Sequence, residues 1–522
     1  MLAVCALLLS LGAGSVPLLD PDESRFARTS VEMVRSGDLV VPHFEGQPRL
    51  VKPPLLHWIQ SSLFGLFRPS ERLARLPSAA ATLLSLLIVG WVALRRFGHE
   101  GALWAAAILG SMPLVMAVGK LGTLDALLAV HVLAIIALDI AEPKETGSHM
   151  GLAVGFLLGL AFLIKGPVGV VIPLLIMLAG RTASRREILP RGQAVIEAVA
   201  GWCVVVLPWA LAFVTRLGFD RAFGIVRGEA LERFFVGADH IEPPWFFLVV
   251  LAVGIFPWIG ALVVALVRVV VQRGDPASRT ALYAGAGLVV GLLFFSLSKS
   301  KLATYILPLP PLAAILLTWE LGQELQSPRK RIVAPLLITT SLVAAGLGLM
   351  LASGLGLDPR AASFAPTGAA IFGIGALLGT GGLILRRPRW VWGGAAASSA
   401  LFLAAAFLLL LPQIALTRTS AYLVDDVPAL RDTNRPVITV DMKVPSLTYY
   451  LDRVPEGVDM KDFESRLARG DSPLFVFDED DLESLPPEVA VRLDRVGQQG
   501  KYVVLEKIET ATDAPLLDGT GR

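Results

Sequence analysis

Charged residues and cysteines are both scarce in this 522-residue chain. Only 17% of its residues are charged, whereas 54% are hydrophobic, and the mean hydropathy is +0.65. This composition excludes an ordinary soluble globular protein and is typical of a helical bundle embedded in a bilayer. The two cysteines, Cys5 and Cys203, lie in apolar runs, which argues against a disulfide framework or a cysteine-rich metal cluster.

The chain also has no large excess of charge of one sign. Its 46 basic and 44 acidic residues give a formal net charge of +2. A nucleic-acid partner is therefore not indicated, and the expected surroundings are membrane lipids.

Long apolar runs dominate the sequence. About 20 apolar residues are needed to cross roughly 30 Å of hydrocarbon. Met1–Leu19 is interpreted as the first transmembrane helix and not as a signal peptide, because it lacks a basic start and further spans follow it. The predicted spans are 2–18, 74–94, 101–118, 121–141, 150–164, 167–180, 194–215, 244–271, 279–297, 302–321, 331–353, 367–385 and 390–412. We therefore predict a mainly α membrane protein with about thirteen transmembrane helices. The two short spans around Lys165-Gly166-Pro167 are alternatively one broken helix.

Lysine and arginine cluster in alternate loops, and this bias predicts the orientation. With a cytoplasmic N-terminus, the inward-facing loops contain Arg95-Arg96, then Arg181, Arg185, Arg186 and Arg191, then Arg268, Arg273 and Arg279, then Arg329-Lys330-Arg331, then Arg386, Arg387 and Arg389. The same count places Asp20–Pro77, the 216–243 loop, Ser298–Lys301 and the C-terminal tail on the outer face.

The composition becomes that of a soluble domain after Pro412. Strand-like runs at 436–440, 474–477 and 502–505 alternate with polar helical stretches such as 461–469. We therefore predict a membrane domain over residues 1–412, and a small C-terminal α/β domain over residues 413–522 on the outer face.

The first outer loop, Asp20–Pro77, begins with the pattern of a helix start. In Asp20-Pro21-Asp22-Glu23 the first Asp can cap the helix, Pro suits the first helical position and Glu can complete a capping box. Asp22 and Arg25 then share one face. A second helix from Pro53 is apolar enough to lie along the membrane surface. The predicted fold therefore includes amphipathic juxtamembrane helices in this loop.

Two charged residues occur where apolar spans should exclude them. Asp125 follows Lys120-Leu121-Gly122-Thr123-Leu124 just inside one span, and Lys165 interrupts another. Charges in such places are costly and usually line a polar cavity, although each residue alone could simply anchor a helix end. In the predicted topology both lie on the same side as Asp22, and this convergence favours a polar site there.

Two further outer segments add polar residues to that side. The 216–243 loop contains Arg227, Glu229, Glu232, Arg233, Asp239, His240 and Glu242, and the next one contains Lys301 and Tyr305. Lysine and arginine bind phosphate, and a carboxylate can take a proton from an attacking hydroxyl, so the set suits a substrate with a phosphate leaving group. A divalent metal at His240 with nearby acids is a weaker hypothesis than a solvated loop histidine.

Several motifs together resemble a known family. They are Asp22-Glu23-Ser24-Arg25-Phe26-Ala27, Ser36-Gly37-Asp38 with Val41-Pro42, Lys52-Pro53-Pro54-Leu55, Lys165-Gly166-Pro167, and Ser298-Lys299-Ser300-Lys301-Leu302-Ala303-Thr304-Tyr305-Ile306-Leu307-Pro308. In this order, from Asp22 to about Pro311, they are similar to the bacterial aminoarabinose (4-amino-4-deoxy-L-arabinose) transferases and to the dolichyl-phosphate-mannose-protein mannosyltransferase-like enzymes of the GT-C class. The C-terminal third is similar only in layout.

The resemblance implies a GT-C fold and a membrane glycosyltransferase of the bacterial inner membrane. Such an enzyme moves a hexosyl or pentosyl group from a polyprenyl-phosphate carrier, such as undecaprenyl phosphate, to an acceptor at the outer, periplasmic face. The acceptor would be lipid A, a glycan or a protein, and the expected course is inversion at the anomeric carbon.

The resemblance also implies roles for individual residues. Asp22 would be the catalytic base and Asp125 a second acid at the site. The residues that would bind the donor phosphate are Lys52, Lys165, Arg25, Lys301 and Tyr305. The family often carries an acid before the Lys-Pro-Pro run, where this chain has Val51. One metal ligand of the family is therefore missing, although a divalent metal remains a hypothesis.

Other functions stay open as alternatives. A transporter or flippase of lipid-linked sugars would also need a charged membrane cavity, but with charges at the midplane that are accessible from both faces. A non-catalytic scaffold would give no reason for the charged cluster in the outer loops. A protein O-mannosyltransferase-like enzyme shares the donor chemistry and differs only in its acceptor.

Overall fold

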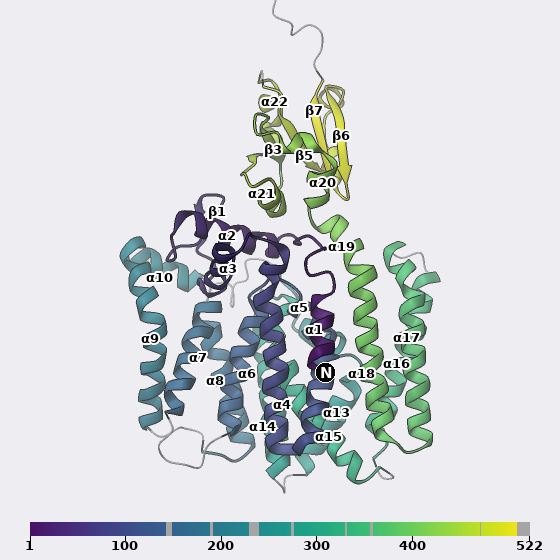
Figure 1. Ribbon diagram of the computed structural model, residues 1–522. Helices are drawn as coiled ribbons and strands as arrows, with labels where there is room; N and C mark the ends of the chain where they lie inside the picture. The colour runs from purple at the N-terminus through teal and green to yellow at the C-terminus, as the bar shows by residue number, and fades with distance from the viewer. Residues whose placement is uncertain are drawn as a thin grey trace, which may run out of the picture. The chain divides into compact units, whose positions relative to one another are not determined.

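The computed structural model describes residues 1–141, 149–187, 192–228, 240–272, 276–328, 331–354, 359–469 and 471–508. These residues form two units. Unit 1 contains Met1–Ser15 and Thr29–Leu411, and unit 2 contains Val16–Arg28 and Pro412–Arg522. Unit 1 is a bundle of helices, and most of unit 2 is an α/β domain (Figure 1).

Unit 1 is built almost entirely of helices. The first are α1 (Leu2–Ser10), α2 (Asp22–Ser36, whose first residues belong to unit 2), α3 (Leu55–Leu66), α4 (Glu71–Gly110), α5 (Pro113–Gly119), α6 (Asp125–Ala141), α7 (Met150–Lys165), α8 (Pro167–Ala183) and α9 (Gly192–Leu217). They are followed by α10 (Phe219–Arg227), α12 (Phe246–Gly254), α13 (Ile259–Val271), α14 (Pro276–Leu297), the 3-10 helix η2 (Ala303–Ile306), α15 (Pro310–Gln326), α16 (Val333–Gly354), α17 (Pro359–Ile384), α18 (Pro388–Ala405) and the π-helix η3 (Ala406–Leu410). The next helix, α19 (Leu411–Arg418), belongs to unit 2 except for its first residue.

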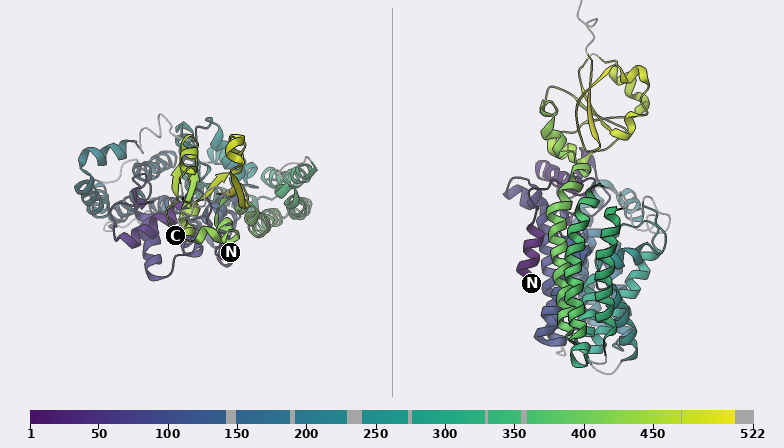
Figure 2. Two further views of the ribbon diagram at one scale, coloured as in Figure 1. Left: turned by 90° about the horizontal axis from the view of Figure 1, so that it is seen from above. Right: turned by 90° about the vertical axis from the view of Figure 1, so that its right-hand side faces the viewer.

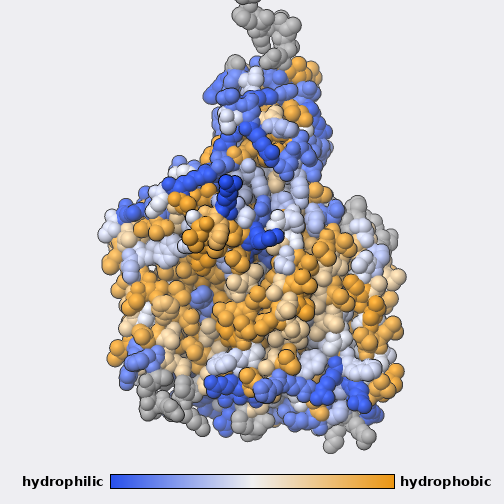
Figure 3. Space-filling model, in the orientation of Figure 1, coloured by the Kyte–Doolittle hydropathy of each residue, from blue (hydrophilic) through white to orange (hydrophobic). Residues whose placement is uncertain are grey.

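Among the described residues, six helices are long and apolar enough to cross a membrane. They are α4, α9, α14, α16, α17 and the continuous run Pro388–Arg418, and the pair α12 and α13, bent by 107°, could make a seventh span. Figure 3 shows a broad hydrophobic band over the helices of unit 1, with hydrophilic residues gathered below it. The mainly α, multi-pass membrane fold is thus confirmed, whereas the number thirteen stays a prediction.

Three of the predicted spans are divided differently in the structure. Helix α1 has nine residues and is therefore shorter than the predicted span 2–18. It ends where the buried Lys120 side chain donates hydrogen bonds to the carbonyl oxygens of Leu8 and Leu9, each at 3.2 Å. The last carbonyl groups of a helix have no hydrogen-bond donors within the helix, and the Lys120 ammonium group donates to them here. The spans predicted at 74–94 and 101–118 meet in α4, which bends at the non-helical Gly98.

Unit 2 contains a five-stranded sheet with the strand order β4-β3-β5-β7-β6. Its strands are β3 (Val437–Val440), β4 (Glu456–Val458), β5 (Leu474–Asp478), β6 (Leu493–Gln499) and β7 (Tyr502–Lys507). Its helices are α20 (Ala421–Asp426), η4 (Pro428–Arg431), α21 (Pro445–Leu451), α22 (Met460–Leu467), α23 (Glu479–Leu482) and α24 (Pro487–Ala490). Strand β3 is parallel to β4 and β5, whereas β7 is antiparallel to β5 and β6.

The two faces of this sheet are covered by different helices, as the right-hand view in Figure 2 shows. Alternate strand residues point to opposite faces. Val437, Val476 and Val504 pack with Leu447 of α21 and with α20 on one face. On the other face, the cluster contains Ile438, Val440, Phe475, Phe477, Val503 and Leu505 with Phe463 and Leu467 of α22. The predicted small C-terminal α/β domain is confirmed.

Candidate functional site

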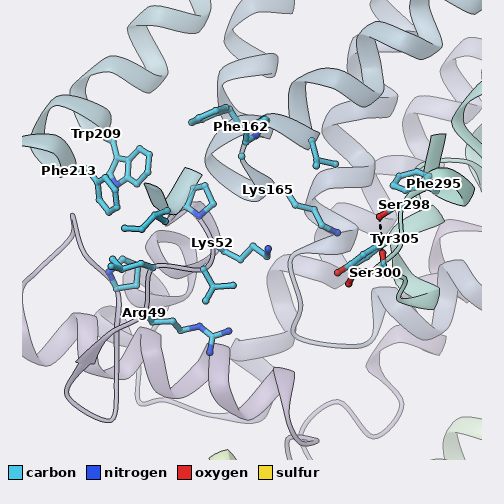
Figure 4. Close-up of a pocket in the computed structure, with 18 of the residues that line it drawn as sticks. Arg49, Lys52, Phe162, Lys165, Trp209, Phe213, Phe295, Ser298, Ser300 and Tyr305 are labelled. Carbon is cyan, nitrogen blue, oxygen red and sulfur yellow. Dashed lines mark hydrogen bonds between the residues drawn. The ribbon is translucent and has the colours of Figure 1, made fainter. Parts of the chain in front are cut away.

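A pocket in unit 1 brings together residues from the first outer loop, α7, α8, α9, α10, α14 and the segment before α15. It has a cavity volume of about 120 Å³. Its lining consists of Pro42, Arg49, Leu50, Val51, Lys52, Pro53, Phe162, Lys165, Gly166, Pro167, Val168, Trp209, Phe213, Ile225, Phe294, Phe295, Ser298, Ser300 and Tyr305. The pocket thus combines three cationic side chains with a largely apolar and aromatic wall (Figure 4).

The loop that carries Lys52 is held by a short hairpin, β1 (His43–Phe44) and β2 (Gln47–Pro48). The Glu32 carboxylate of α2 accepts hydrogen bonds from the backbone N–H groups of the hairpin turn, Glu45 at 3.0 Å and Gly46 at 3.1 Å. Directly after the hairpin, the chain passes Lys52 and enters α3. Figure 4 shows the Lys52 and Lys165 side chains extending from different elements toward the same space.

Asp38 connects this first loop to α9. Its Oδ1 accepts hydrogen bonds from the backbone N–H groups of Val40 at 2.9 Å and Val41 at 3.1 Å. The same oxygen forms an ion pair with Nη1 of Arg216 at 2.5 Å. Partial burial acts to raise the pKa of Asp38, but these hydrogen bonds and the Arg216 charge hold the pKa below its ordinary value. The Trp209 indole N–H donates to the Val40 carbonyl at 3.0 Å. These contacts place the aromatic residues of α9 beside the loop.

A sharp reversal between α7 and α8 places Lys165. Gly166 separates the two helices with φ +63°, a conformation that glycine adopts without steric cost, and Pro167 starts α8. Helix α8 then packs so closely on α7 that a Cβ on Gly169 would lie 2.1 Å from the Ala161 carbonyl oxygen. The two helices are therefore a tight hairpin and not one broken helix (Figure 1). Lys165 stands at its tip, as the last residue of α7.

The Lys165 ammonium group has two close partners. Its Nζ lies 2.6 Å from Oδ1 of Asp125, the first residue of α6, and 4.0 Å from the centre of the Tyr305 ring. The side chains of Lys165 and Asp125 are only 9% and 12% exposed, which strengthens their mutual attraction. A cation over an aromatic ring is a further favourable contact. Lys165, Asp125 and Tyr305 are thus brought together, while their roles in the reaction stay predictions.

Lys301 follows the lining residue Ser300 in the chain but is not itself among the residues that line the pocket. Its backbone N–H donates to the His240 carbonyl at 3.0 Å, and its Nζ donates to the Glu242 carbonyl at 2.8 Å. Burial lowers the pKa of Lys301. In this structure Lys301 therefore ties the segment before α12 to the start of η2, and its contact with a donor phosphate stays a prediction.

A metal site was the weaker hypothesis for His240. Within the described ranges, no three His, Cys, Asp or Glu side chains gather as a metal would require. A metal-binding role of the described residues therefore stays a prediction. Glu229, Glu232, Arg233 and Asp239 lie outside the described residues, so the ligand role of His240 stays a prediction.

Asp22 and Arg25 belong to the part of α2 that is assigned to unit 2. Asp22 is the first residue of the helix, and its Oδ1 lies 4.0 Å from Nη1 of Arg25. The Asp22 side chain is 51% exposed. It is thus open to a reaction partner, and the base role of Asp22 and the phosphate role of Arg25 stay predictions.

Two groups of lining residues were not predicted from the sequence. Arg49 lies three residues before Lys52 in the same loop, and that spacing of two cations was the available signal. The aromatic residues of α7, α9 and α14 carried no signal, because a lipid-facing phenylalanine and a pocket-lining one look alike in an apolar run. Those residues are Phe162, Trp209, Phe213, Phe294 and Phe295.

Comparison with known sequences identifies several similar proteins. A family described as dolichyl-phosphate-mannose-protein mannosyltransferase matches residues 51–212. The undecaprenyl phosphate-alpha-4-amino-4-deoxy-L-arabinose arabinosyl transferase of Edwardsiella ictaluri is 33% identical over 407 residues, which cover 72% of this chain and 70% of that protein. The corresponding transferase of Aeromonas hydrophila subsp. hydrophila is 35% identical over 310 residues, covering 58% and 55%. The chain thus spans just over half the length of the Aeromonas relative.

Solved structures share the fold. The crystal structure of ArnT from Cupriavidus metallidurans bound to undecaprenyl phosphate superimposes with a TM-score of 0.80 over 97% of both chains, at 21% sequence identity. The Archaeoglobus fulgidus oligosaccharyltransferase gives a TM-score of 0.53 at 11% identity, over 92% of this chain and 69% of that one. The predicted GT-C fold is therefore confirmed.

Proposed function

Because the chain belongs to the family of undecaprenyl phosphate-alpha-4-amino-4-deoxy-L-arabinose arabinosyl transferases, we propose that it is a glycosyltransferase with a polyprenyl-phosphate-linked sugar as its donor. It is a multi-pass protein of the bacterial inner membrane, as its apolar helices and its relatives indicate. The predicted topology puts the reaction at the outer, periplasmic face. The proposed carrier is undecaprenyl phosphate, after which the relatives are named.

The observation that carries the proposal is the composition of the pocket. Arg49, Lys52 and Lys165 provide cationic groups, and the remaining wall is mostly aromatic and aliphatic. Lysine and arginine form strong, charge-assisted hydrogen bonds with phosphate. A prenyl chain is apolar and gains free energy when it leaves water for such a wall. A polyprenyl phosphate has both of these parts, and therefore matches the pocket better than a soluble nucleotide sugar does.

The proposed reaction is a single displacement. The acceptor hydroxyl oxygen bonds to the anomeric carbon, and the bond between that carbon and the carrier phosphate oxygen breaks. The electron pair leaves with the lipid phosphate, whose charge Lys52 and Lys165 stabilise, and the hydroxyl proton goes to the Asp22 carboxylate. Attack opposite to the leaving group inverts the anomeric carbon. The proposed sugar is the pentose 4-amino-4-deoxy-L-arabinose and the proposed acceptor is lipid A, on the strength of the family.

Loss of the gene is expected to remove one sugar from an outer-face glycan while its carrier-linked donor accumulates. Mass spectrometry of lipid A, polysaccharide and periplasmic proteins, with and without the gene, identifies the acceptor and the mass of the sugar. A strain that carries the Lys52→Met variant serves as the matched comparison. Unchanged glycans together with an unchanged pool of lipid-linked sugars would contradict the proposal.

The Lys52→Met variant is expected to raise the KM for the lipid-linked donor about tenfold, because it removes one charge-assisted hydrogen bond to the phosphate. The measurement is sugar transfer by the purified full chain at varied donor concentration. Lys461→Met is the control, because Lys461 is 74% exposed and pairs only locally, with Asp459 at 3.3 Å. An unchanged donor KM in Lys52→Met would remove Lys52 from phosphate binding.

A further inference from the structure

The sheet of unit 2 has a ligand-binding geometry at the carboxyl ends of β3 and β5. Strand β3 lies between β4 and β5; the connection from β3 to β4 contains α21 on one face of the sheet, and the connection from β4 to β5 contains α22 on the other face. In open α/β sheets of this kind, ligands bind outside the carboxyl ends of the strands at the point where the strand order reverses. The carboxyl ends of β3 and β5 are therefore the expected position for a ligand in this sheet.

The occupant is the side chain of Asp20, from the Val16–Arg28 segment of the same unit. Its Oδ1 accepts a hydrogen bond from the Ser446 N–H at 2.8 Å, and its Oδ2 accepts one from the Ser446 hydroxyl. Ser446 lies in the connection after β3. The Tyr502 hydroxyl, 3.5 Å from Oδ2, comes from β7 at the residue paired with Asp478, the end of β5. The carboxylate thus sits where a ligand's anionic group would be bound.

The Ser446 hydroxyl group, which donates to Asp20, is held in place by a second contact. Ser446 and Ser420 are both fully buried, and the Ser420 N–H donates to the Ser446 Oγ at 2.9 Å. On the other side, the Ser24 hydroxyl also donates to Oδ1 of Asp20. Burial raises the pKa of Asp20, against the opposing effect of these hydrogen bonds. These residues form a preformed binding site for one carboxylate, and the Asp20 side chain of the same chain occupies it.

Three further contacts hold the segment, two of them at α21 and its C-terminal end and one at α19. The Leu18 N–H donates to the Tyr450 hydroxyl at 2.8 Å. Arg28 Nη1 forms an ion pair with Asp452 Oδ1 at 2.8 Å, and Asp452 is the residue directly after α21. The Asp20 N–H donates to the Arg418 carbonyl at 2.7 Å. Leu18 and Asp20 precede α2, and Arg28 lies in its second turn, so the first turn of α2 is held from both sides.

We propose that the C-terminal domain is an intramolecular clamp for the start of α2, and that Asp20 and Ser446 are positioning residues for Asp22. The inference rests on the proposed function, in which Asp22 takes the proton of the acceptor. Asp22 follows the clamped Asp20 by two residues and is itself largely exposed, so its position is set by the backbone that precedes and follows it. A displacement of about 1 Å at a reacting group can cost a hundredfold in rate.

The first test measures the clamp directly in the full-length protein. Hydrogen–deuterium exchange at the amides of residues 18–24 is expected to become at least tenfold faster in Ser446→Ala, which removes one donor to Asp20 and one acceptor for the Ser420 N–H. Ser446→Thr keeps the hydroxyl and should restore slow exchange. Ser484→Ala is the matched control, because that exposed hydroxyl donates only to the nearby Asp481 carbonyl.

The second test separates positioning from folding. With undecaprenyl phosphate-linked 4-amino-4-deoxy-L-arabinose and lipid A as substrates, Ser446→Ala and Asp20→Asn are expected to lower kcat about tenfold, with the KM for the donor within twofold of the wild type. The KM for the donor should stay unchanged, because the pocket residues belong to unit 1 whereas Asp20 and Ser446 belong to unit 2. Ser446→Thr should recover kcat. Exchange in β5 and α22 must stay slow, which shows that the domain is folded.

Each outcome decides the proposal. Unchanged exchange at residues 18–24 in Ser446→Ala would overturn the clamp. Fast exchange with an unchanged kcat would overturn the positioning role and leave only a structural contact. A wild type that transfers no sugar from any lipid-linked donor would overturn the proposed function and the positioning role together, while the exchange result still decides whether the clamp exists.

Discussion

Replacing Lys165 with methionine is expected to lower kcat/KM for sugar transfer by about 10²–10³-fold, the loss usual for one preorganised group that stabilises developing charge. Lys165 stands at the pocket wall, where the proposed reaction leaves a lipid phosphate. The same change leaves the Asp125 carboxylate without the ammonium group that lies 2.6 Å from it. An uncompensated buried charge costs roughly 3–5 kcal/mol, so the single variant should also unfold more readily.

A double variant distinguishes these two effects. Asp125→Asn combined with Lys165→Met removes both charges, so the free energy of unfolding should return toward the wild-type value while transfer stays more than about 10²-fold reduced. The measurements are steady-state transfer and thermal unfolding of the same preparations. Recovery of transfer in the double variant would show that Lys165 acts only by neutralising Asp125.

Replacing Asp22 with asparagine is expected to lower kcat about 10³-fold, because general base catalysis contributes about 10²–10⁴-fold and asparagine cannot take the acceptor proton. The side chain keeps its size, so the KM for the lipid-linked donor should change little. The measurement is the pre-steady-state and steady-state transfer rate with saturating donor. Asp22→Glu keeps a carboxylate at a shifted position and should retain part of the activity.

The alternative role for Asp22 is that it complements the dipole at the start of α2. Asp462→Asn is the matched control, since Asp462 is an exposed acidic residue in the first turn of α22. If Asp22 acts only on the helix, both variants should show the same small loss of stability, within about 1 kcal/mol, and full activity. Normal turnover by Asp22→Asn would remove Asp22 from the base role.

The sequence predicted those parts of the fold that depend on local pattern. Apolar runs and their basic flanks indicated a multi-pass bundle, and alternating strands after Pro412 indicated an α/β domain. Lys165 and Asp125 were singled out because a charge inside an apolar run is costly unless it is paired, and the structure pairs them with each other. The family resemblance, carried by ordered motifs, is confirmed by the relatives and by the shared fold.

The parts that the sequence did not predict depend on contacts between distant segments. Asp20 was predicted to cap α2, and this is wrong, because its carboxylate accepts hydrogen bonds from Ser446, which is 426 residues away. The Glu23 carboxylate does reach back, but to the Leu19 N–H at 3.0 Å. No local rule distinguishes a capping aspartate from one that enters another part of the fold, because the sequence pattern of both is the same.

Two different kinds of structure carry the cationic residues of the pocket: the helix hairpin of α7 and α8, and a loop. Lys165 is carried by two helices joined through a single glycine, whereas Arg49 and Lys52 are carried by a connecting segment between β2 and α3. Loops tolerate sequence change far better than packed helices do. Relatives that accept donors with larger or smaller sugars should therefore differ in length and composition around residues 49–54, while the Lys165-Gly166-Pro167 corner stays the same. Under the proposed function, donor preference is then the property that should be open to redesign without repacking the membrane core.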